Sequence, residues 1–417
     1  MNAANECCNR APTMTFKAIA ASFLVSMVRN YVRIHRQILP RQQREILVAP
    51  PASAGSLGDQ ALLQGLHDGL SREWNCHLRQ VLLPNYEVIP LQNEGSSKID
   101  VHGGTLSDLR LLLALRNARL FCVLGADVID GRYDEGQALY YLHALDLAAS
   151  AGVPSRLFGF SFSEEPNPRV VDRFKSLAAE IVCCARDPVS HRRFTGFTGR
   201  EARQVADLAF QVAAKAVSAS ALRALEWIRH EKQGGARVIA LNGNILTNPS
   251  DPDRIKIAYV ELIDELAAKD GSLRFVLVPH DFRGKESDQL CHSRIFAELG
   301  DMARNRTFLL EPPLHAWDAK AIAAASDLVV TGRMHFAIAA LGSGVPAIGI
   351  GYMGKFEGLL GYFDLKSLLI TPQSAYNDLM LPVKVLEALP LLSTYREQIA
   401  RHIGVVKNLS KENFSGL

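Results

Sequence analysis

Arg333 and His335 lie two positions apart in the segment TGRMHFAIAALGSGVPAIGIGYMGK, which begins at Thr331. A guanidinium keeps its positive charge and can form two parallel hydrogen bonds to a carboxylate or a phosphate, and an imidazole can carry a proton near neutral pH. Together the two side chains could hold an anion and transfer a proton to it. The alternatives are structural: the arginine could pair with a neighbouring carboxylate, and the histidine could be a core residue.

The sequence around this pair predicts where the two side chains lie. Residues 325–330 are typical of a short strand, 336–341 of an apolar helix packed on a parallel sheet, and 347–350 of a second buried strand. Arg333 and His335 then lie where a strand ends and a helix begins, which is the edge at which open α/β sheets bind ligands. Three further side chains are predicted to contact the same ligand: Met334, Tyr352 and Lys355.

Polar side chains follow two other predicted strands. Arg186 comes after a strand at 181–184 and could form the second arm of a two-arginine clamp around a small dianion. His280 and Asp281 come after a strand at 275–278. This neighbouring pair could orient an imidazole for proton transfer, or it could cap the helix that follows.

Two glycine-containing loops in the first half of the chain add weaker signals. GSLGDQAL contains Gly58 and Asp59, which could contact a phosphate or begin the next helix. The loop has neither the lysine of a Walker motif nor the GxGxxG spacing of a dinucleotide site, so ATP and NAD are not indicated. In GADVIDG, Asp127 could contact sugar hydroxyls or cap a turn. We expect no metal, because no Cys-x-x-Cys pair occurs and the anion binding and proton transfer described above need none.

Strand and helix signals alternate along the chain, with strands expected at 45–49 and 155–160 in its first half, which predicts doubly wound parallel sheets. The length of 417 residues exceeds one ordinary core, so we expect two Rossmann-like α/β domains that face each other across a cleft. The expected divisions are an N-terminal domain with a bridging helix at 45–233, a C-terminal domain with the Arg-x-His motif at 234–375, and a helical segment at 376–417.

Residues 1–44 have a different composition, because no acidic residue occurs between Glu6 and Glu45. Seven basic residues do occur there: Arg10, Lys17, Arg29, Arg33, Arg36, Arg41 and Arg44. The apolar run at 18–28 is too short to span a bilayer. We expect a basic amphipathic arm. It could be a helix within residues 10–44 that contacts the membrane surface, a helix packed on a domain, or a mobile leader.

The overall charge and the cysteines narrow the class of protein further. A net charge of +3 gives no reason to expect nucleic acid as a partner. The seven cysteines are odd in number and lie mostly in apolar strands, which is typical of reduced thiols in a cytoplasmic protein.

Taken in order, seven segments between about Glu45 and Phe363 resemble the polysaccharide pyruvyl transferase family. They are GSLGDQAL, GADVIDG, GFSFSEEPNP, ARDPVS, ADLAF, PHD and GRMHFAIAALGSGVPAIGIGYMGK. The resemblance implies a fold like that of GT-B glycosyltransferases. It also implies transfer of the enolpyruvyl unit of phosphoenolpyruvate to a sugar of a surface or exopolysaccharide, or of its lipid-linked precursor. The product is a pyruvate ketal, and phosphate is released without a cofactor.

The resemblance also implies roles for three residues. Arg186 matches the arginine of the family's Arg-Asp motif, and Arg333 and His335 match its Arg-x-His motif, both of which hold phosphoenolpyruvate. His335 would then donate the proton to the methylene carbon. GADVIDG departs from the family pattern, because it has one glycine where many members have a run, and residues 1–44 lie outside the resemblance.

Two other functions remain open from the sequence. A nucleotide-sugar glycosyltransferase of the same architecture would use Glu357 for a ribose and Arg333 for a pyrophosphate. A sugar-binding protein without catalytic activity would have no need of Arg186, and the glycosyltransferase would leave the Arg-x-His spacing without a distinct task.

Overall fold

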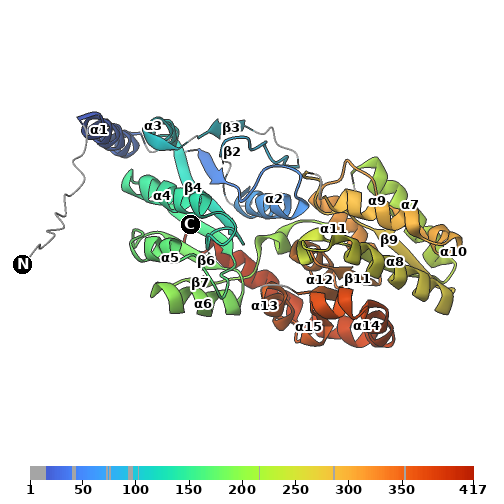
Figure 1. The fold of residues 1–417 in the computed structure, drawn as a ribbon. Coiled ribbons are helices and arrows are strands. Elements are labelled where there is room, and N and C mark those ends of the chain that lie inside the picture. Colours follow the sequence, from blue (N-terminus) through green and yellow to red (C-terminus); the bar gives the residue numbers. More distant parts are fainter. Residues whose placement is uncertain are drawn as a thin grey trace, which may run out of the picture.

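The computed structural model places the chain in two lobes, each built on one parallel sheet (Figure 1). The described residues are 16–39, 44–71, 74, 77–92, 97–101, 103–215, 217–284, 287–351 and 354–417. The N-terminal sheet has the strand order β3-β2-β1-β4-β5-β6-β7, and the C-terminal sheet has the order β10-β9-β8-β11-β12-β13. The molecule therefore has the two doubly wound domains that the sequence predicts.

The strands of the N-terminal sheet are β1 Glu45–Ala49, β2 His77–Leu82, β3 Ser97–Asp100, β4 Ala118–Ala126, β5 Ser155–Phe160, β6 Val182–Ala185 and β7 Arg203–Gln204. Those of the C-terminal sheet are β8 Arg237–Asn242, β9 Leu273–Leu277, β10 Thr307–Leu309, β11 Leu328–Thr331, β12 Ala347–Ile350 and β13 Leu369–Ile370. The inner strands β5, β11 and β12 are buried along their whole length, because helices cover both faces of the sheets.

The helices of the N-terminal domain are α1 Phe16–Ile38, α2 Leu57–Ser71, α3 Gly104–Leu115, α4 Glu135–Ser150, α5 Pro168–Lys175 and α6 Pro188–Thr198. Those of the C-terminal domain and the C-terminal segment are α7 Ala219–Gln233, α8 Pro252–Lys269, α9 Asp288–Glu298, α10 Asp301–Asn305, α11 Ala316–Ala325, α12 Met334–Leu341, α13 Lys355–Gly361, α14 Leu381–Ala388 and α15 Leu392–Lys411. Several helices begin at a residue whose side chain accepts from the first turn, such as Asp134, Asp187 and Ser218.

The order of strands reverses between β1 and β4 in one sheet and between β8 and β11 in the other. In open α/β sheets, the loops that leave adjacent strands at such a reversal diverge to opposite faces and open a crevice at the carboxyl edge. Gly58 and Asp59 follow β1, Asp127 follows β4, and Arg333 follows β11. The fold thus brings these predicted site residues to the two crevices.

The domain divisions in the structure differ from the expected ones in two places. Helix α7, expected to close the N-terminal domain, packs on α11 and buries Ala221, Ala224 and Ile228 in the C-terminal core. The chain therefore crosses between the domains before Ala219 rather than at residue 234. The C-terminal segment returns to the N-terminal domain after α15, where Arg156 donates to the carbonyl oxygen of Asn413 at 2.5 Å.

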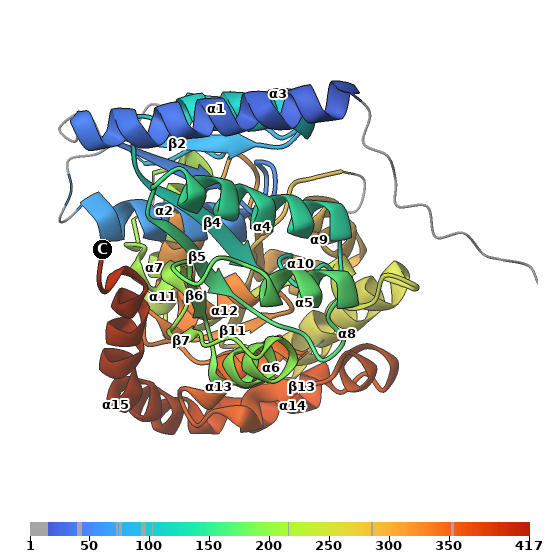
Figure 2. The ribbon, with the colours of Figure 1, turned by 90° about the vertical axis from the view of Figure 1, so that its left-hand side faces the viewer.

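The predicted N-terminal arm contains α1, which packs on the N-terminal domain next to α3 (Figures 1 and 2). Val32 is fully buried, and the Arg36 guanidinium donates to the carbonyl oxygens of Leu115, Ala118 and Gly152. The structure therefore shows that one face of this helix is packed on the domain, and contact with a membrane stays a prediction. Among the described residues, no helix is long and apolar enough to cross a membrane.

Candidate active site

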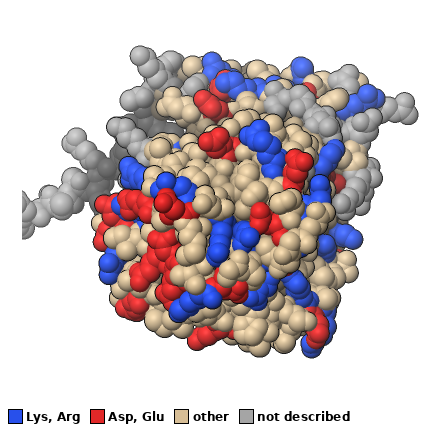
Figure 3. All heavy atoms as spheres, turned by 90° about the vertical axis from the view of Figure 1, so that its right-hand side faces the viewer, with Lys and Arg blue, Asp and Glu red and all other residues tan. Residues whose placement is uncertain are grey.

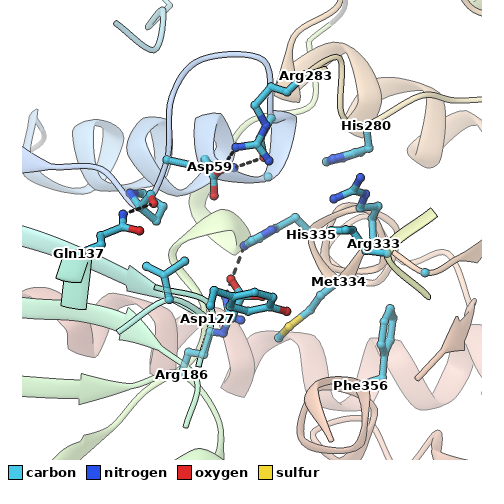
Figure 4. A pocket seen from close by; sticks show the side chains of 18 of the residues that line it. Asp59, Asp127, Gln137, Arg186, His280, Arg283, Arg333, Met334, His335 and Phe356 are labelled. Carbon is cyan, nitrogen blue, oxygen red and sulfur yellow. Dashed lines mark hydrogen bonds and ion pairs between the residues drawn. The ribbon is translucent and has the colours of Figure 1, made fainter. Parts of the chain in front are cut away.

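Both domains contribute side chains to a pocket of about 250 Å³ between the carboxyl edges of the two sheets (Figure 4). Eight of the predicted site residues line it: Gly58, Asp59, Asp127, Arg186, His280, Arg333, Met334 and His335. The first four belong to the N-terminal domain and the other four to the C-terminal domain. Residues from distant parts of the sequence therefore meet at one site.

His335 lies in the first turn of α12 and reaches across to the N-terminal domain. Its Nε2 atom is 3.5 Å from a terminal nitrogen of Arg186 and 3.7 Å from Oδ2 of Asp207. The side chain is 15% exposed, so the ring still faces the pocket. A Cβ atom at Gly58 would be 2.3 Å from Nδ1 of His335, so the ring lies directly against the first turn of α2.

Arg186 follows β6, and its side chain is only 1% exposed. Its Nε donates to Oγ of Ser161 at 2.7 Å, and a terminal nitrogen donates to Oδ2 of Asp207 at 3.1 Å. Burial would raise the pKa of Asp207, but the hydrogen bond and charge of His335 and the charge of Arg186 hold that pKa below its usual value. Asp207 therefore stays ionised and fixes both side chains at the rim of the pocket.

Arg333 is held by two carboxylates of the C-terminal domain. Its Nε and one terminal nitrogen donate to the two oxygens of Asp288, at 3.2 and 2.7 Å, and the other terminal nitrogen lies 3.3 Å from Oδ2 of Asp281. Burial would raise the pKa of Asp288, but the charge and hydrogen bonds of Arg333 lower it. The bidentate geometry fixes the plane of the guanidinium where Arg333 lines the pocket.

Of the two roles considered for His280 and Asp281, the pairing of the two side chains is not formed. Asp281 instead accepts from Arg283, at 2.6 Å, and lies against Arg333, and it does not line the pocket. Burial lowers the pKa of His280 to about 3, so its ring is neutral near pH 7. His280 can therefore contribute a hydrogen bond to a ligand, and Asp281 acts through the two arginines that it holds.

Loops from the two domains are joined by backbone hydrogen bonds beside the pocket. Leu57 N donates to the carbonyl oxygen of His280 at 3.0 Å, and Phe282 N donates to that of Gly55 at 2.8 Å. Arg283 adds an ionic contact of 3.6 Å to Asp59. The GSLGDQAL loop and the PHD loop therefore hold each other across the domain boundary.

Two carboxylates, Asp59 and Asp127, lie on the N-terminal side of the pocket. In Figure 4 the His335 ring lies between them. Burial raises the pKa of Asp59, although the charges of Arg283 and His335 act in the opposite direction. A carboxyl group with a raised pKa is a better acceptor of protons near neutral pH than an ordinary carboxylate.

The structure leaves two predicted residues without a placed side chain. Tyr352 lies outside the described residues, and Lys355 begins α13 but its side chain lies outside the described part. Glu357, which the glycosyltransferase alternative would use for a ribose, does not line the pocket and lies 3.7 Å from Lys366.

Several residues at the site were not among those predicted from the sequence. Asp207 and Asp288 anchor the arginines, and the following residues line the pocket: Tyr86, Tyr133, Gln137, Leu246, Arg283 and Phe356. Asp207 follows the short strand β7, so its position after a strand was a usable signal. Tyr133 lies in the loop after β4, as Asp127 does, and so carried the same signal, whereas Tyr86 follows β2, a strand that was not predicted.

Comparisons with solved structures show the architecture. A protein described as a UDP-N-acetylglucosamine 2-epimerase from Listeria monocytogenes superimposes with a TM-score of 0.58 at 13% identity, covering 86% of this chain and 91% of that chain. The trehalose-6-phosphate synthase OtsA gives 0.56 at 12% identity, with 89% and 98% covered. MnaA of S. aureus with UDP gives 0.53 at 13% identity, with 85% and 90% covered. The fold is therefore that of GT-B glycosyltransferases.

Sequence comparisons give one result that bears on function. No curated protein sequence matches the chain. A family model described as polysaccharide pyruvyl transferase matches residues 72–353, which is more than half of the 417 residues and contains Asp127, Arg186, Arg333 and His335. The chain therefore belongs to the polysaccharide pyruvyl transferase family.

Proposed function

We propose that the protein transfers the enolpyruvyl unit of phosphoenolpyruvate to a sugar of a surface or exopolysaccharide, or of its lipid-linked precursor. The observation that carries the proposal is the meeting of Arg186, Arg333 and His335 in one pocket, with an arginine from each domain. Phosphoenolpyruvate has a carboxylate and a phosphate, and two guanidinium groups suit two anionic groups on one small molecule.

The proposed reaction balances without a cofactor or a metal. His335 gives a proton to the methylene carbon, and the adjacent carbon becomes positively charged and is attacked by one sugar hydroxyl. The carbon–oxygen bond to phosphate then breaks, and a second hydroxyl of the same sugar closes the ketal. One hydroxyl proton replaces the proton given by His335, and the other leaves with phosphate. Asp59, with its raised pKa, is the proposed acceptor of a hydroxyl proton.

The size and lining of the pocket support a small donor. A volume of about 250 Å³ is below the roughly 300–1,000 Å³ typical of sites for drug-sized ligands, so a three-carbon phosphate suits it better than a nucleotide sugar. Tyr133 lines the pocket with half of its side chain exposed and offers a flat surface to the acceptor sugar. We place the reaction in the cytoplasm, since the four cysteines of the described part are free and buried.

The test compares donors on the same protein. In a thermal-shift experiment, phosphoenolpyruvate at a hundred times its Kd should stabilise the protein by about 2.7 kcal/mol, and nucleotide sugars at the same concentration should not. Stabilisation by a nucleotide sugar alone would support the glycosyltransferase instead.

Catalysis is tested by phosphate release with a saccharide acceptor. His335→Gln should keep much of the affinity for phosphoenolpyruvate and lower turnover by about 10² to 10⁴-fold, since a general acid contributes that much. Turnover within a few-fold of the parent would assign the proton to another group.

A further inference from the structure

Helix α1 has one face buried against the domain and one face exposed, and both faces carry apolar side chains. The buried face contributes Val32 to the core of the N-terminal domain, and Val25 and Val28 pack partly against the same core. On this side Arg36 donates to three carbonyl oxygens of the domain. Figure 2 shows α1 lying along the outer edge of the molecule, with α3 beside it. The helix is therefore held in place and presents its other face outward.

The outward face of α1 is mostly apolar, with the exposed polar residues Asn30 and Gln37 at one edge. Its large side chains, each between 46% and 69% exposed, are Ile19, Phe23, Leu24, Met27, Tyr31, Ile34 and Ile38. At 100° per residue these positions fall within an arc of about 140°. We call this arc the α1 stripe. A surface helix normally turns polar residues to the solvent, so a stripe of this length indicates a surface that is covered by a partner.

The charges beside the α1 stripe indicate what kind of partner covers it. Helix α1 contains no acidic residue. Arg29 and Arg33 project between the stripe and the buried face, from the flank where the helix meets the domain. On the face of the C-terminal domain seen in Figure 3, by contrast, both acidic and basic side chains are present.

A second copy of the chain suits this charge pattern poorly. Two α1 stripes packed against each other would bring Arg29 and Arg33 of both copies together, with no acidic side chain on either helix to pair with them. An anionic lipid surface satisfies both features, because acyl chains accept the apolar residues and headgroups accept the arginines.

We propose that the α1 stripe inserts into the interfacial region of a bilayer that contains anionic lipids, with α1 lying in the plane of the membrane. The contacts of Val32 and Arg36 on the buried face would hold the N-terminal domain to the membrane-bound helix. The inference does not depend on the identity of the donor or the acceptor. An enzyme held in this way would meet a lipid-linked acceptor at a raised local concentration.

The experiment measures sedimentation of the full chain with vesicles of phosphatidylcholine, with or without phosphatidylserine. The test variant is Phe23→Glu with Met27→Glu, and both side chains are exposed. The matched control is Leu222→Glu with Val405→Glu, which makes the same charge change at exposed apolar residues of α7 and α15. We expect the parent and the control to sediment with anionic vesicles. The partition coefficient of the α1 variant should be lower than that of the parent by a factor of at least about ten.

The charges are tested separately by Arg29→Gln with Arg33→Gln. This variant should lose the salt-sensitive part of binding to phosphatidylserine vesicles and keep the part that is insensitive to salt. Circular dichroism and the thermal midpoint establish that each variant is folded.

Three results would overturn the inference. The parent could remain in the supernatant with anionic vesicles at low salt, or the α1 variant could sediment as well as the control. Light scattering without lipid could show a dimer that Phe23→Glu with Met27→Glu dissociates, which would assign the stripe to a second copy. Each readout omits phosphoenolpyruvate and sugar, so failure here would leave the proposed reaction unaffected.

Discussion

Arg333 is a residue whose function depends on how its charge is already paired. Asp288 binds its Nε and one terminal nitrogen, and Asp281 lies beside the other. These carboxylates fix the plane of the guanidinium, so its orientation is set before a ligand arrives. Arg186 is held in the same way by Ser161 and Asp207. The site is therefore preorganised by buried carboxylates that do not line the pocket.

The first residue-scale prediction concerns Arg333→Lys. The charge is kept, but an ammonium cannot bind Asp288 in a bidentate manner and reach the ligand as well. We expect affinity for phosphoenolpyruvate to fall by roughly 10 to 100-fold, since hydrogen bonds to charged groups are worth about 1.5–3 kcal/mol. Titration calorimetry measures the Kd. An unchanged Kd in both Arg333→Lys and Arg186→Lys would rule out the two-arginine clamp.

The second residue-scale prediction concerns Gly58. An alanine Cβ there would lie 2.3 Å from Nδ1 of His335, so the ring must move. We expect turnover to fall about 100-fold, because displacement of a catalytic group by about 1 Å has effects of that order. Gly404→Ala in α15 is the control, since the new Cβ would have no atom within 4 Å apart from its chain neighbours and the helix's own backbone. Equal turnover in the two variants, both folded by thermal unfolding, would show that the ring is not held by α2.

At the scale of elements, loops after two strands join the domains, and the end of a C-terminal helix supports the site. The loop after β1 and the loop after β9 bind each other through Leu57 and His280, and so hold the two carboxyl edges together. The end of α15 supports the site from behind, where Ser410 Oγ donates to the carbonyl oxygen of Asp207 at 2.8 Å. The C-terminal segment is therefore connected to the active site, although its sequence carries none of the family motifs.

The element-scale prediction concerns α1. Deleting residues 1–44 removes Val32 from the core and leaves the carbonyl oxygens of Leu115 and Gly152 without Arg36. Burial of a valine side chain and charged hydrogen bonds are each worth about 1.5–3 kcal/mol, so we expect a loss of at least about 3 kcal/mol or aggregation. Deleting residues 1–15, which keeps α1, is the control. Equal urea midpoints for the two truncations would show that α1 does not support the domain.

At the scale of the whole molecule, burial of ionisable groups couples stability to pH. Burial lowers the pKa of His280 to about 3 and that of His292 to about 4, and both titrate near 6.5 in the unfolded chain. Below pH 6.5 the unfolded state therefore binds more protons than the folded state. The free energy of unfolding consequently decreases as the pH is lowered. The raised pKa of Asp59 has the opposite effect on the free energy of unfolding, but this is one group against the two histidines.

The whole-molecule prediction follows from that balance. The free energy of unfolding should fall between pH 6.5 and 5, with each histidine contributing up to about 1.4 kcal/mol per pH unit. Urea denaturation at several pH values measures the slope. His292→Gln should reduce it, because the side chain still offers an acceptor to Gly243 N but no longer titrates. A slope unchanged in that variant would show that His292 is not buried in its neutral form.

The sequence by itself determined the position of inner strands and the carboxyl ends of strands at which the site residues lie. β1, β5 and β12 have the predicted limits, because helices cover both faces and the strands are continuous apolar runs. The edge strands β3 and β10, and β2 next to β3, were not predicted. Each carries polar or partly exposed residues, so it lacks the apolar run that marks a buried strand.

Only the tertiary structure decided which residues act together. Asp207 and His335 are 128 positions apart, and their contact exists because two sheets place their carboxyl edges face to face. The same is true of Asp281, whose partners are arginines and not the neighbouring histidine. Local pattern fixes the end of a strand at which a side chain lies, but packing of distant elements fixes the direction and the partner of that side chain.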